Sequence, residues 1–179
     1  MRNKLLLSMS MVSTLLFATH YEVDRDHSLV GFKIRHAVVA TVEGKFNDFM
    51  GEYEYDDQLH YFKAFHGEVQ TASVDTHEPY RDKHLRNKVF DVEHYPHMSF
   101  DMITQEGGMF HGRLTLKGIT KEVNLTIGRA TQAEDTFLLS GTILRKDFNL
   151  TFSDMAEIGG IVVGDDVEIN VMFRGKAKE

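Results

Sequence analysis

The chain has 179 residues, no cysteine, and 27 acidic against 20 basic residues, for a formal net charge of −7. A chain of this length is long enough to bury one hydrophobic core. Its acidic balance argues against sequence-independent binding of nucleic acid or of anionic membranes, because both need clustered positive charge. Without cysteine, thiol catalysis and disulfides are excluded, so stability must come from the packed core.

Residues 1–18 have the pattern of a secretory signal peptide. Arg2 and Lys4 precede 14 residues, from Leu5 to Ala18, that carry no charge, and the chain turns polar from Thr19. The run is shorter than the roughly 20 residues of a membrane-spanning helix, and a basic start before a short apolar run is typical of export signals. We therefore expect residues 1–18 to be removed. A retained membrane anchor is the alternative.

Removal of residues 1–18 leaves one domain, residues 19–179, with a formal net charge of −9, because the removed segment holds two basic and no acidic residues. We expect this domain outside the cytoplasm, without stable insertion into a membrane.

Most of the domain alternates apolar and polar residues, the pattern of antiparallel strands with one buried face. Turn-forming glycines such as Gly107, Gly108 and Gly118 separate some of these segments. About eight strands are predicted, which indicates an all-β domain that is either a closed barrel or a sandwich. The alternating segments lie near residues 30–36, 45–55, 62–74, 99–104, 113–117, 123–127, 137–143 and 167–173.

One stretch does not alternate, and the chain's two prolines, Pro79 and Pro96, bracket it. Residues 79–87 are predicted to form a short helix with proline in its first turn. Residues 91–95 add a single turn that Pro96 stops. In a barrel, such an insertion would cap or line one mouth.

Several residue strings resemble those of the YceI-like family, in the same order and with the same spacing across nearly all of residues 19–179. The resemblance is looser at Asn149, where the family usually has glycine, and around residues 153–164. The matching strings are Tyr21-Glu22-Val23-Asp24, His27-Ser28, Val30-Gly31-Phe32-Lys33-Ile34-Arg35-His36, Val42-Glu43-Gly44-Lys45-Phe46-Asn47-Asp48-Phe49, Ser73-Val74-Asp75-Thr76, Arg81-Asp82-Lys83-His84-Leu85, Phe90-Asp91, Tyr95-Pro96, residues 112–121 and Arg145-Lys146-Asp147-Phe148.

This resemblance implies an eight-stranded antiparallel, lipocalin-like barrel with a short helix inserted between strands in the middle of the chain. It implies binding, for transport or storage, of a polyisoprenoid, an isoprenoid quinone or a fatty acid or amide. The expected place is the periplasm of a Gram-negative bacterium. No catalytic residue and no cofactor other than the bound lipid are implied, and members of the family often form homodimers through outward strand faces.

Alternation and the resemblance together nominate residues that line the barrel interior. An eight-stranded barrel is either filled by side chains or wide enough for one small ligand, and alternation alone leaves both alternatives open. His36 is also open to a second interpretation, as a hydrogen-bonded structural histidine. The predicted tunnel lining consists of Phe32, Ile34, His36, Phe46, Phe49, Phe90, Phe100, Met102, Leu114, Leu116, Leu125, Ile143 and Phe148.

The lipid head group is predicted to contact Arg81, Asp82 and His84, on the helix near one mouth. An arginine fork suits a phosphate or a carbonyl oxygen. The alternative is that Arg81 and Asp82 pair with each other, while His84 packs beneath the helix.

Two other classes of function remain as alternatives. Ten histidines suggest a metal-binding barrel, but none has the spacing of a known metal motif. An enzyme acting on a bound prenyl or acyl lipid is the second alternative, although no nucleophile elbow, phosphate loop or dinucleotide fingerprint is present.

Overall fold

The computed structural model describes residues 19–36, 40–130, 135–151 and 163–178. The predicted signal peptide, residues 1–18, lies outside the described residues.

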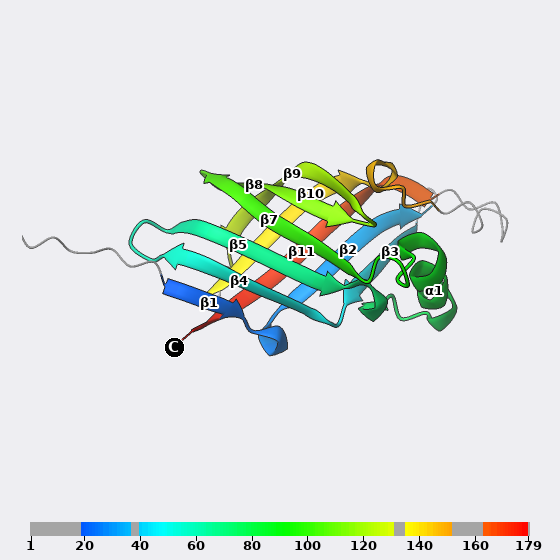
Figure 1. Ribbon diagram of the computed structural model, residues 1–179, viewed down its shortest axis with the longest axis horizontal. Coiled ribbons are helices and arrows are strands. Elements are labelled where there is room, and N and C mark those ends of the chain that lie inside the picture. The colour runs from blue at the N-terminus through cyan, green and yellow to red at the C-terminus, as the bar shows by residue number, and fades with distance from the viewer. Residues whose placement is uncertain (1–18, 37–39, 131–134, 152–162, 179) are drawn as a thin grey trace, which may run out of the picture.

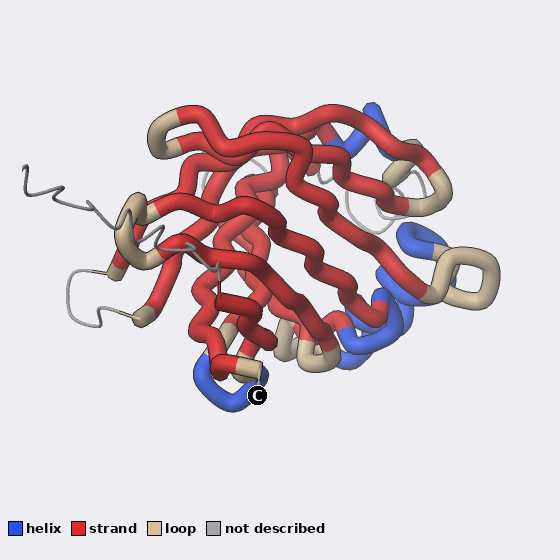
Figure 2. The backbone as a smooth tube through the Cα atoms, turned by 60° about the vertical axis from the view of Figure 1, so that its left-hand side comes forward, coloured by secondary structure: helices blue, strands red, loops and turns tan. Residues whose placement is uncertain are grey.

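The described residues form a single antiparallel sheet of eleven strand segments, closed into a barrel (Figures 1 and 2). The segments are β1 (Thr19–Val23), β2 (Leu29–His36), β3 (Ala40–Phe46), β4 (Phe49–Asp56), β5 (Tyr61–Gln70), β6 (Val74–Asp75), β7 (His97–Glu106), β8 (Met109–Leu116), β9 (Ile119–Arg129), β10 (Thr136–Leu144) and β11 (Val163–Ala177).

These eleven segments make eight strands, because three strands are each interrupted once. The turn η1 (Arg25–His27) separates β1 from β2, and both lie on the same edge of β11. Residues 47–48 separate β3 from β4, and the turn η2 (Thr71–Ser73) separates β5 from β6. Strands adjacent in sequence pair with one another, and β11 closes the sheet. The predicted eight-stranded antiparallel barrel is confirmed.

The inserted helix lies between β6 and β7. It consists of α1 (Pro79–His84) followed by the π-helical turn η3 (Leu85–Phe90). The Glu78 side chain caps α1 by accepting hydrogen bonds from the backbone N–H groups of Tyr80 and Arg81, at 3.0 and 2.5 Å. The turn after it is closed by hydrogen bonds from the His94 and Tyr95 N–H groups to the Asp91 carbonyl oxygen. Both predicted helical features are present.

The barrel has two different ends (Figure 1). The α1 end carries the inserted helix, the β8–β9 turn at residues 117–118 and the turn η4 (Arg145–Phe148). The terminal end carries Thr19, the last residues of β11 and the β4–β5 turn at residues 57–60. None of the described helices is long and apolar enough to cross a membrane.

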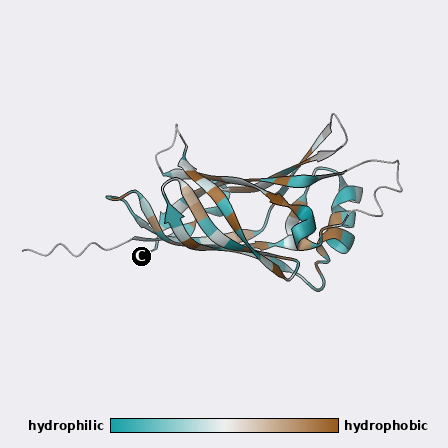
Figure 3. Ribbon diagram, turned by 90° about the horizontal axis from the view of Figure 1, so that it is seen from above, coloured by the Kyte–Doolittle hydropathy of each residue, from teal (hydrophilic) through white to brown (hydrophobic). Residues whose placement is uncertain are grey.

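Along the strands, hydrophobic and hydrophilic residues alternate (Figure 3), and the inward side chains fill the two halves of the barrel differently. In the terminal half, six aromatic rings pack with centroid separations of 4.7–6.1 Å and exposures of 5 % or less. We call this group the aromatic plug. It consists of Tyr53, Tyr55, Phe62, Phe110, Phe137 and Phe173.

The α1 half has mainly aliphatic side chains on its inner wall, among them Leu114, Leu116, Leu125 and Leu139. These side chains line a hollow and do not fill it. The filled interior and the hollow interior that alternation left open are therefore both present, one in each half.

Candidate functional site

A cavity of about 190 Å³ occupies the α1 half of the barrel, and its wall is almost wholly apolar. Ten of the thirteen residues predicted to line a tunnel border it. These are Phe32, Ile34, Phe46, Phe49, Phe90, Phe100, Leu114, Leu116, Leu125 and Ile143. Whether they contact a ligand stays a prediction.

Two residues predicted to line the tunnel do not border the cavity. Phe148 leaves the strand pattern, because residues 145–148 form the turn η4, and its ring is 1 % exposed within the core. Met102 packs against the core beside an irregularity in the β7–β8 pairing, between Met102 and Thr104, which interrupts simple alternation. The side chain of His36 lies outside what the structure describes.

Sequence reasoning missed several wall residues. Leu85 and Val89 of the π-helical turn border the cavity, and their spacing of four residues is the helical signal that would have identified them. Leu139 and Leu150 also border it. No sequence pattern distinguishes them from ordinary core leucines.

Two aromatic rings form the floor of the cavity. Phe65 and Phe173 both border the cavity, with ring centroids 5.1 Å apart. Phe65 contacts the aromatic plug at Phe110 (5.7 Å), and Phe173 is itself a member of the plug, where its ring contacts Phe137 (5.4 Å). The cavity therefore ends where the plug begins.

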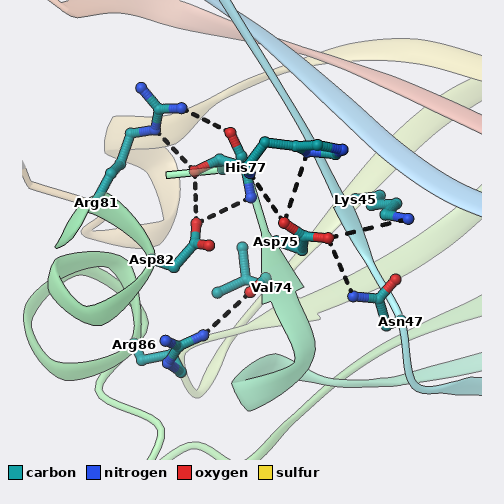
Figure 4. Close-up of polar contacts among 9 residues, drawn as sticks. Lys45, Asn47, Val74, Asp75, His77, Arg81, Asp82 and Arg86 are labelled. Atoms are coloured by element: carbon teal, nitrogen blue, oxygen red, sulfur yellow. Dashed lines mark hydrogen bonds and ion pairs between the residues drawn. The ribbon is translucent and has the colours of Figure 1, made fainter. Parts of the chain in front are cut away.

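The inserted helix supplies part of the cavity rim. Arg81 borders the cavity, and its guanidinium donates from Nε to the Thr76 hydroxyl and from Nη2 to the Thr76 carbonyl oxygen, both at 2.8 Å. Asp82 accepts from the Thr76 N–H at 2.9 Å and from the Thr76 hydroxyl at 2.5 Å. Arg81 and Asp82, which Figure 4 shows side by side on α1, thus both bond to Thr76.

This arrangement contradicts one alternative, whereas head-group contact by Arg81, Asp82 and His84 stays a prediction. Arg81 and Asp82 do not pair with each other, because Thr76 lies between them and bonds to both. Of the three predicted head-group residues, only Arg81 borders the cavity. Asp82 is 7 % exposed and its Oδ1 atom accepts two hydrogen bonds from Thr76. His84 is half-buried but does not border the cavity.

A second arginine borders the cavity, and its charge is compensated within the fold. Arg145 donates to the carbonyl oxygens of Gly164 (2.9 Å) and Leu150 (2.8 Å) and forms an ion pair with Asp165 (2.9 Å). The ammonium group of Lys146, with a smaller effect of Arg145, lowers the pKa of Asp165. Arg81 differs: in the described part of the chain, no carboxylate forms an ion pair with it and its Nη1 atom has no hydrogen-bond acceptor.

The start of the insertion is fixed to the barrel by further polar contacts (Figure 4). Asp75 accepts hydrogen bonds from the His77 N–H (2.9 Å) and from Asn47 (3.4 Å), and these two groups are the main reasons that the pKa of Asp75 is lowered. Arg86 donates to the Val74 carbonyl oxygen at 3.1 Å. The rim residue Arg81 is therefore held on a well-anchored segment.

Among the described residues, no three His, Asp or Glu side chains are grouped so that they could hold a metal ion.

The chain matches the YceI-like domain over residues 21–174. It is 34 % identical over 171 residues to a UPF0312 protein of Yersinia pestis, with 84 % of this chain and 88 % of the relative covered. It is 32 % identical over 194 residues to a UPF0312 protein of Pectobacterium atrosepticum, with 98 % of both chains covered.

Solved structures share the fold. The YCEI protein of Campylobacter jejuni is 31 % identical, with a TM-score of 0.65 over 87 % of this chain and 96 % of that one. A polyisoprenoid binding domain from Saccharophagus degradans has a TM-score of 0.70 over 90 % of this chain and 99 % of its own, and at 13 % identity it shows the fold alone. From the match over residues 21–174 and these relatives, the chain belongs to the YceI-like family.

Proposed function

We propose that this protein binds one amphiphilic lipid, with the tail in the cavity and the head group at the rim beside Arg81, and that it carries or stores this lipid. The observation that carries the proposal is the apolar cavity of about 190 Å³ with a guanidinium on its rim. Apolar walls with very few polar groups are typical of sites for hydrophobic ligands.

The energetics suit an amphiphile. Each methylene moved from water into the cavity contributes about 0.8 kcal/mol. Ordering the tail and losing its free motion offset much of this gain. Affinity then depends mainly on the tail, and one cation suffices to orient the head group.

The candidate ligands are polyisoprenoids, isoprenoid quinones and fatty acids or amides. A polyisoprenoid binding domain is among the structural neighbours, which supports the first class at the level of the fold. The edge of Arg81 that has no partner among the described residues favours head groups with acceptor oxygens, above all phosphate or carboxylate.

We favour binding over catalysis because of the chemistry of the rim. Catalysis on the bound lipid would need an acid, a base or a nucleophile aimed at it. The two guanidinium groups that border the cavity, Arg81 and Arg145, stay protonated in proteins and so serve neither as base nor as nucleophile. Ser28, Glu68 and Ser99 also border it. Glu68 forms an ion pair with His97 at 3.1 Å, the Ser28 hydroxyl accepts the Arg174 N–H at 3.1 Å, and no described base contacts the Ser99 hydroxyl.

Export to the periplasm of a Gram-negative bacterium is part of the proposal and rests on the sequence of residues 1–18. N-terminal sequencing of the protein from its own host should start near residue 19. Recovery of intact Met1 in the membrane fraction would refute export.

The binding proposal is tested by titrating a fluorescent long-chain fatty acid into the protein, with and without a chelator. We expect one probe per chain, no effect of the chelator, and no chemical change of the probe. Loss of binding with the chelator would favour a metal-binding barrel, and turnover of the probe would favour an enzyme.

A pair of variants locates the probe. Val69→Thr puts one hydroxyl on the cavity wall at nearly constant volume and should weaken binding by about tenfold, because a buried hydroxyl without a partner costs about 1–3 kcal/mol. Ala64→Ser adds a hydroxyl at an exposed position of the same strand and should leave binding unchanged. Equal effects of the two changes would place the probe outside the cavity.

A further inference from the structure

The terminal end of the barrel has a hollow of its own, of about 370 Å³, which we call the terminal hollow. It opens between the β4–β5 turn, the β7–β8 turn and the end of β9, at the end of the barrel opposite α1 (Figure 1). Tyr55, Phe62 and Phe137 of the aromatic plug border it, and these rings are 5 % exposed or less. The plug therefore separates the terminal hollow from the apolar cavity in the α1 half.

Arg129, the last residue of β9, holds its guanidinium over two of these rings. The guanidinium carbon lies 5.4 Å from the centroid of the Tyr55 ring and 5.2 Å from that of the Phe137 ring. Its Nη2 atom donates a hydrogen bond to the Tyr55 hydroxyl at 2.6 Å. The attraction between a cation and two ring faces, together with this hydrogen bond, orients the guanidinium before any ligand binds. Little further side-chain freedom is then lost on binding.

Most N–H donors of Arg129 have no partner within the described part of the chain. Its Nε and Nη1 atoms have no hydrogen-bond acceptor there, and no described carboxylate forms an ion pair with the guanidinium. By contrast, Arg174 at the same end of the barrel pairs with Asp135 at 2.5 Å. Because the guanidinium is a planar fork, Arg129 retains a free edge that can bind an oxyanion through two parallel N–H donors.

The surroundings of Arg129 favour an anion. Among the described residues that border the terminal hollow, none is an aspartate or a glutamate, although the chain as a whole has a formal net charge of −7. The Tyr55 hydroxyl accepts from Arg129 and keeps its own proton as a donor, and the Nδ1 atom of His60 lies 3.4 Å from it. A Cβ atom at Gly107 or Gly128, which also border the hollow, would meet no atom within 4 Å.

We propose that the terminal hollow binds a small oxyanion, a carboxylate or a phosphate, with the free edge of Arg129 as the main contact and the Tyr55 hydroxyl as a second donor. The bound molecule is a water-soluble anion rather than a lipid head group, because the close-packed plug leaves no apolar space beneath Arg129 for a tail. Since one guanidinium at an exposed position supplies most of the attraction, we expect a dissociation constant of about 1 mM.

Two-dimensional NMR of the nitrogen-15-labelled protein tests this site without any lipid. Sodium phosphate and, separately, sodium acetate are titrated in at pH 6.5, and sodium chloride is adjusted so that the ionic strength stays constant. We expect saturating shifts of the backbone amide signals of Gly107, Gly108 and Gly128 and of the Nε–H signal of Arg129, because all four residues border the hollow.

Variants of Arg129 test its role as the main contact. Arg129→Gln removes the charge and the fork at an exposed position, so the protein should still fold, and binding of both anions should weaken by about tenfold. Arg129→Lys keeps the charge without the fork and should give an intermediate affinity. Arg113→Gln, at an exposed outward position of β8, also removes one positive charge and should leave both affinities unchanged.

A dissociation constant that rises in Arg129→Gln and stays the same in Arg113→Gln supports the site. If the signals at the terminal hollow move without saturation, or if the two glutamine variants behave alike, the proposal is overturned. Its failure would leave the proposed lipid binding untouched, because the fatty-acid titration reports on the cavity on the other side of the plug.

Discussion

Arg81 has one structural role at the rim of the cavity and a second role that we propose. Its Nε and Nη2 atoms hold the backbone and hydroxyl of Thr76, and this fixes the start of the inserted helix to the barrel. Arg81 also borders the cavity, and the proposed second role is to contact the lipid head group there. Because one guanidinium has five N–H donors in a planar fork, both roles are compatible.

Replacing Arg81 should therefore affect both stability and ligand choice. Arg81→Ala should lower the free energy of unfolding by about 1–2 kcal/mol, since two hydrogen bonds are lost. It should weaken carboxylate- or phosphate-headed lipids by about tenfold, and neutral ones far less, because hydrogen bonds to charged groups contribute about 1.5–3 kcal/mol. Denaturant melts and probe displacement measure the two effects.

The exposed outward Arg113 on β8 provides the matched control, because Arg113→Ala also removes one positive charge. If Arg81→Ala weakens charged and neutral lipids equally, Arg81 has only the structural role.

Several aspartates make the fold sensitive to acid. Asp56 is 4 % exposed, and its carboxylate accepts the N–H groups of Gln58 (3.1 Å) and Leu59 (3.0 Å) and pairs with Lys63 (3.2 Å). The Leu59 N–H is the largest cause that lowers the pKa of Asp56 from its ordinary value of 3.8. Hydrogen bonds from the side chain of Lys176 foremost, and then His27, lower the pKa of Asp24 in the same direction.

Because these carboxyl groups bind protons less readily in the folded state, their contribution to the free energy of unfolding is fully present at neutral pH. It is lost as the pH falls below about 4, through the folded-state pKa. Asp56→Asn should reduce stability at pH 7 and flatten its decline between pH 5 and pH 3, in denaturant melts across that range. Asp166→Asn, at an exposed position of β11, should keep the steep decline. If the stability of Asp56→Asn declines as steeply between pH 5 and pH 3 as that of the unaltered protein, Asp56 does not cause the acid sensitivity.

At the scale of elements, alternation predicted the strands but not the interruptions in them. The break at η1 depends on Asp24, which accepts the Asp26 N–H at 3.2 Å and pairs with Lys176 at 2.8 Å. Lys176 is far away in sequence, so no local pattern reveals the contact. The helix between the prolines was predictable, because proline fixes its own φ angle and lacks an N–H donor, and both effects can be read from the local sequence.

Alternation also limits what could be predicted of the site. It separates inward from outward positions, which is why most of the predicted lining residues border the cavity. It failed at Met102 and Phe148, where an irregular pairing and a turn break the period of two. Alternation also cannot tell which inward side chains meet across the barrel. The division into an aromatic plug and a cavity could therefore not be predicted from it.

The division into a plug and a cavity predicts that Phe→Ala lowers the free energy of unfolding by different amounts on two neighbouring strands, β7 and β8. Phe110 in the plug is 0 % exposed and contacts the rings of Phe62 (5.0 Å) and Phe65 (5.7 Å). Phe110→Ala should cost about 3–5 kcal/mol, the usual range for a close-packed ring. Phe100 borders the cavity and contacts one ring, Phe65 (6.1 Å), so Phe100→Ala should cost about 1–3 kcal/mol.

Urea melts of the two variants measure this difference, and lipid displacement shows which of them changes the preferred tail length. Only Phe100→Ala should change it. Equal costs for both rings, with no effect on tail preference, would indicate that the α1 half is as filled as the terminal half.

At the scale of the whole molecule, the proposed binding site and the close-packed aromatic plug lie in different halves of one barrel. Empty apolar volume costs contacts that a packed interior would make. The plug supplies such contacts in the terminal half, through rings that are almost fully buried. The α1 half can therefore remain hollow, and the anchored helix places Arg81 at its rim.

The central claim is that this hollow holds a single amphiphile, and native mass spectrometry of the protein purified from its own host tests it most directly. We predict a mass excess of one lipid per chain, lost after extraction with organic solvent and restored when a long-chain fatty acid is added. A protein that shows only its own mass, both as purified and after incubation with excess fatty acid, would contradict the claim.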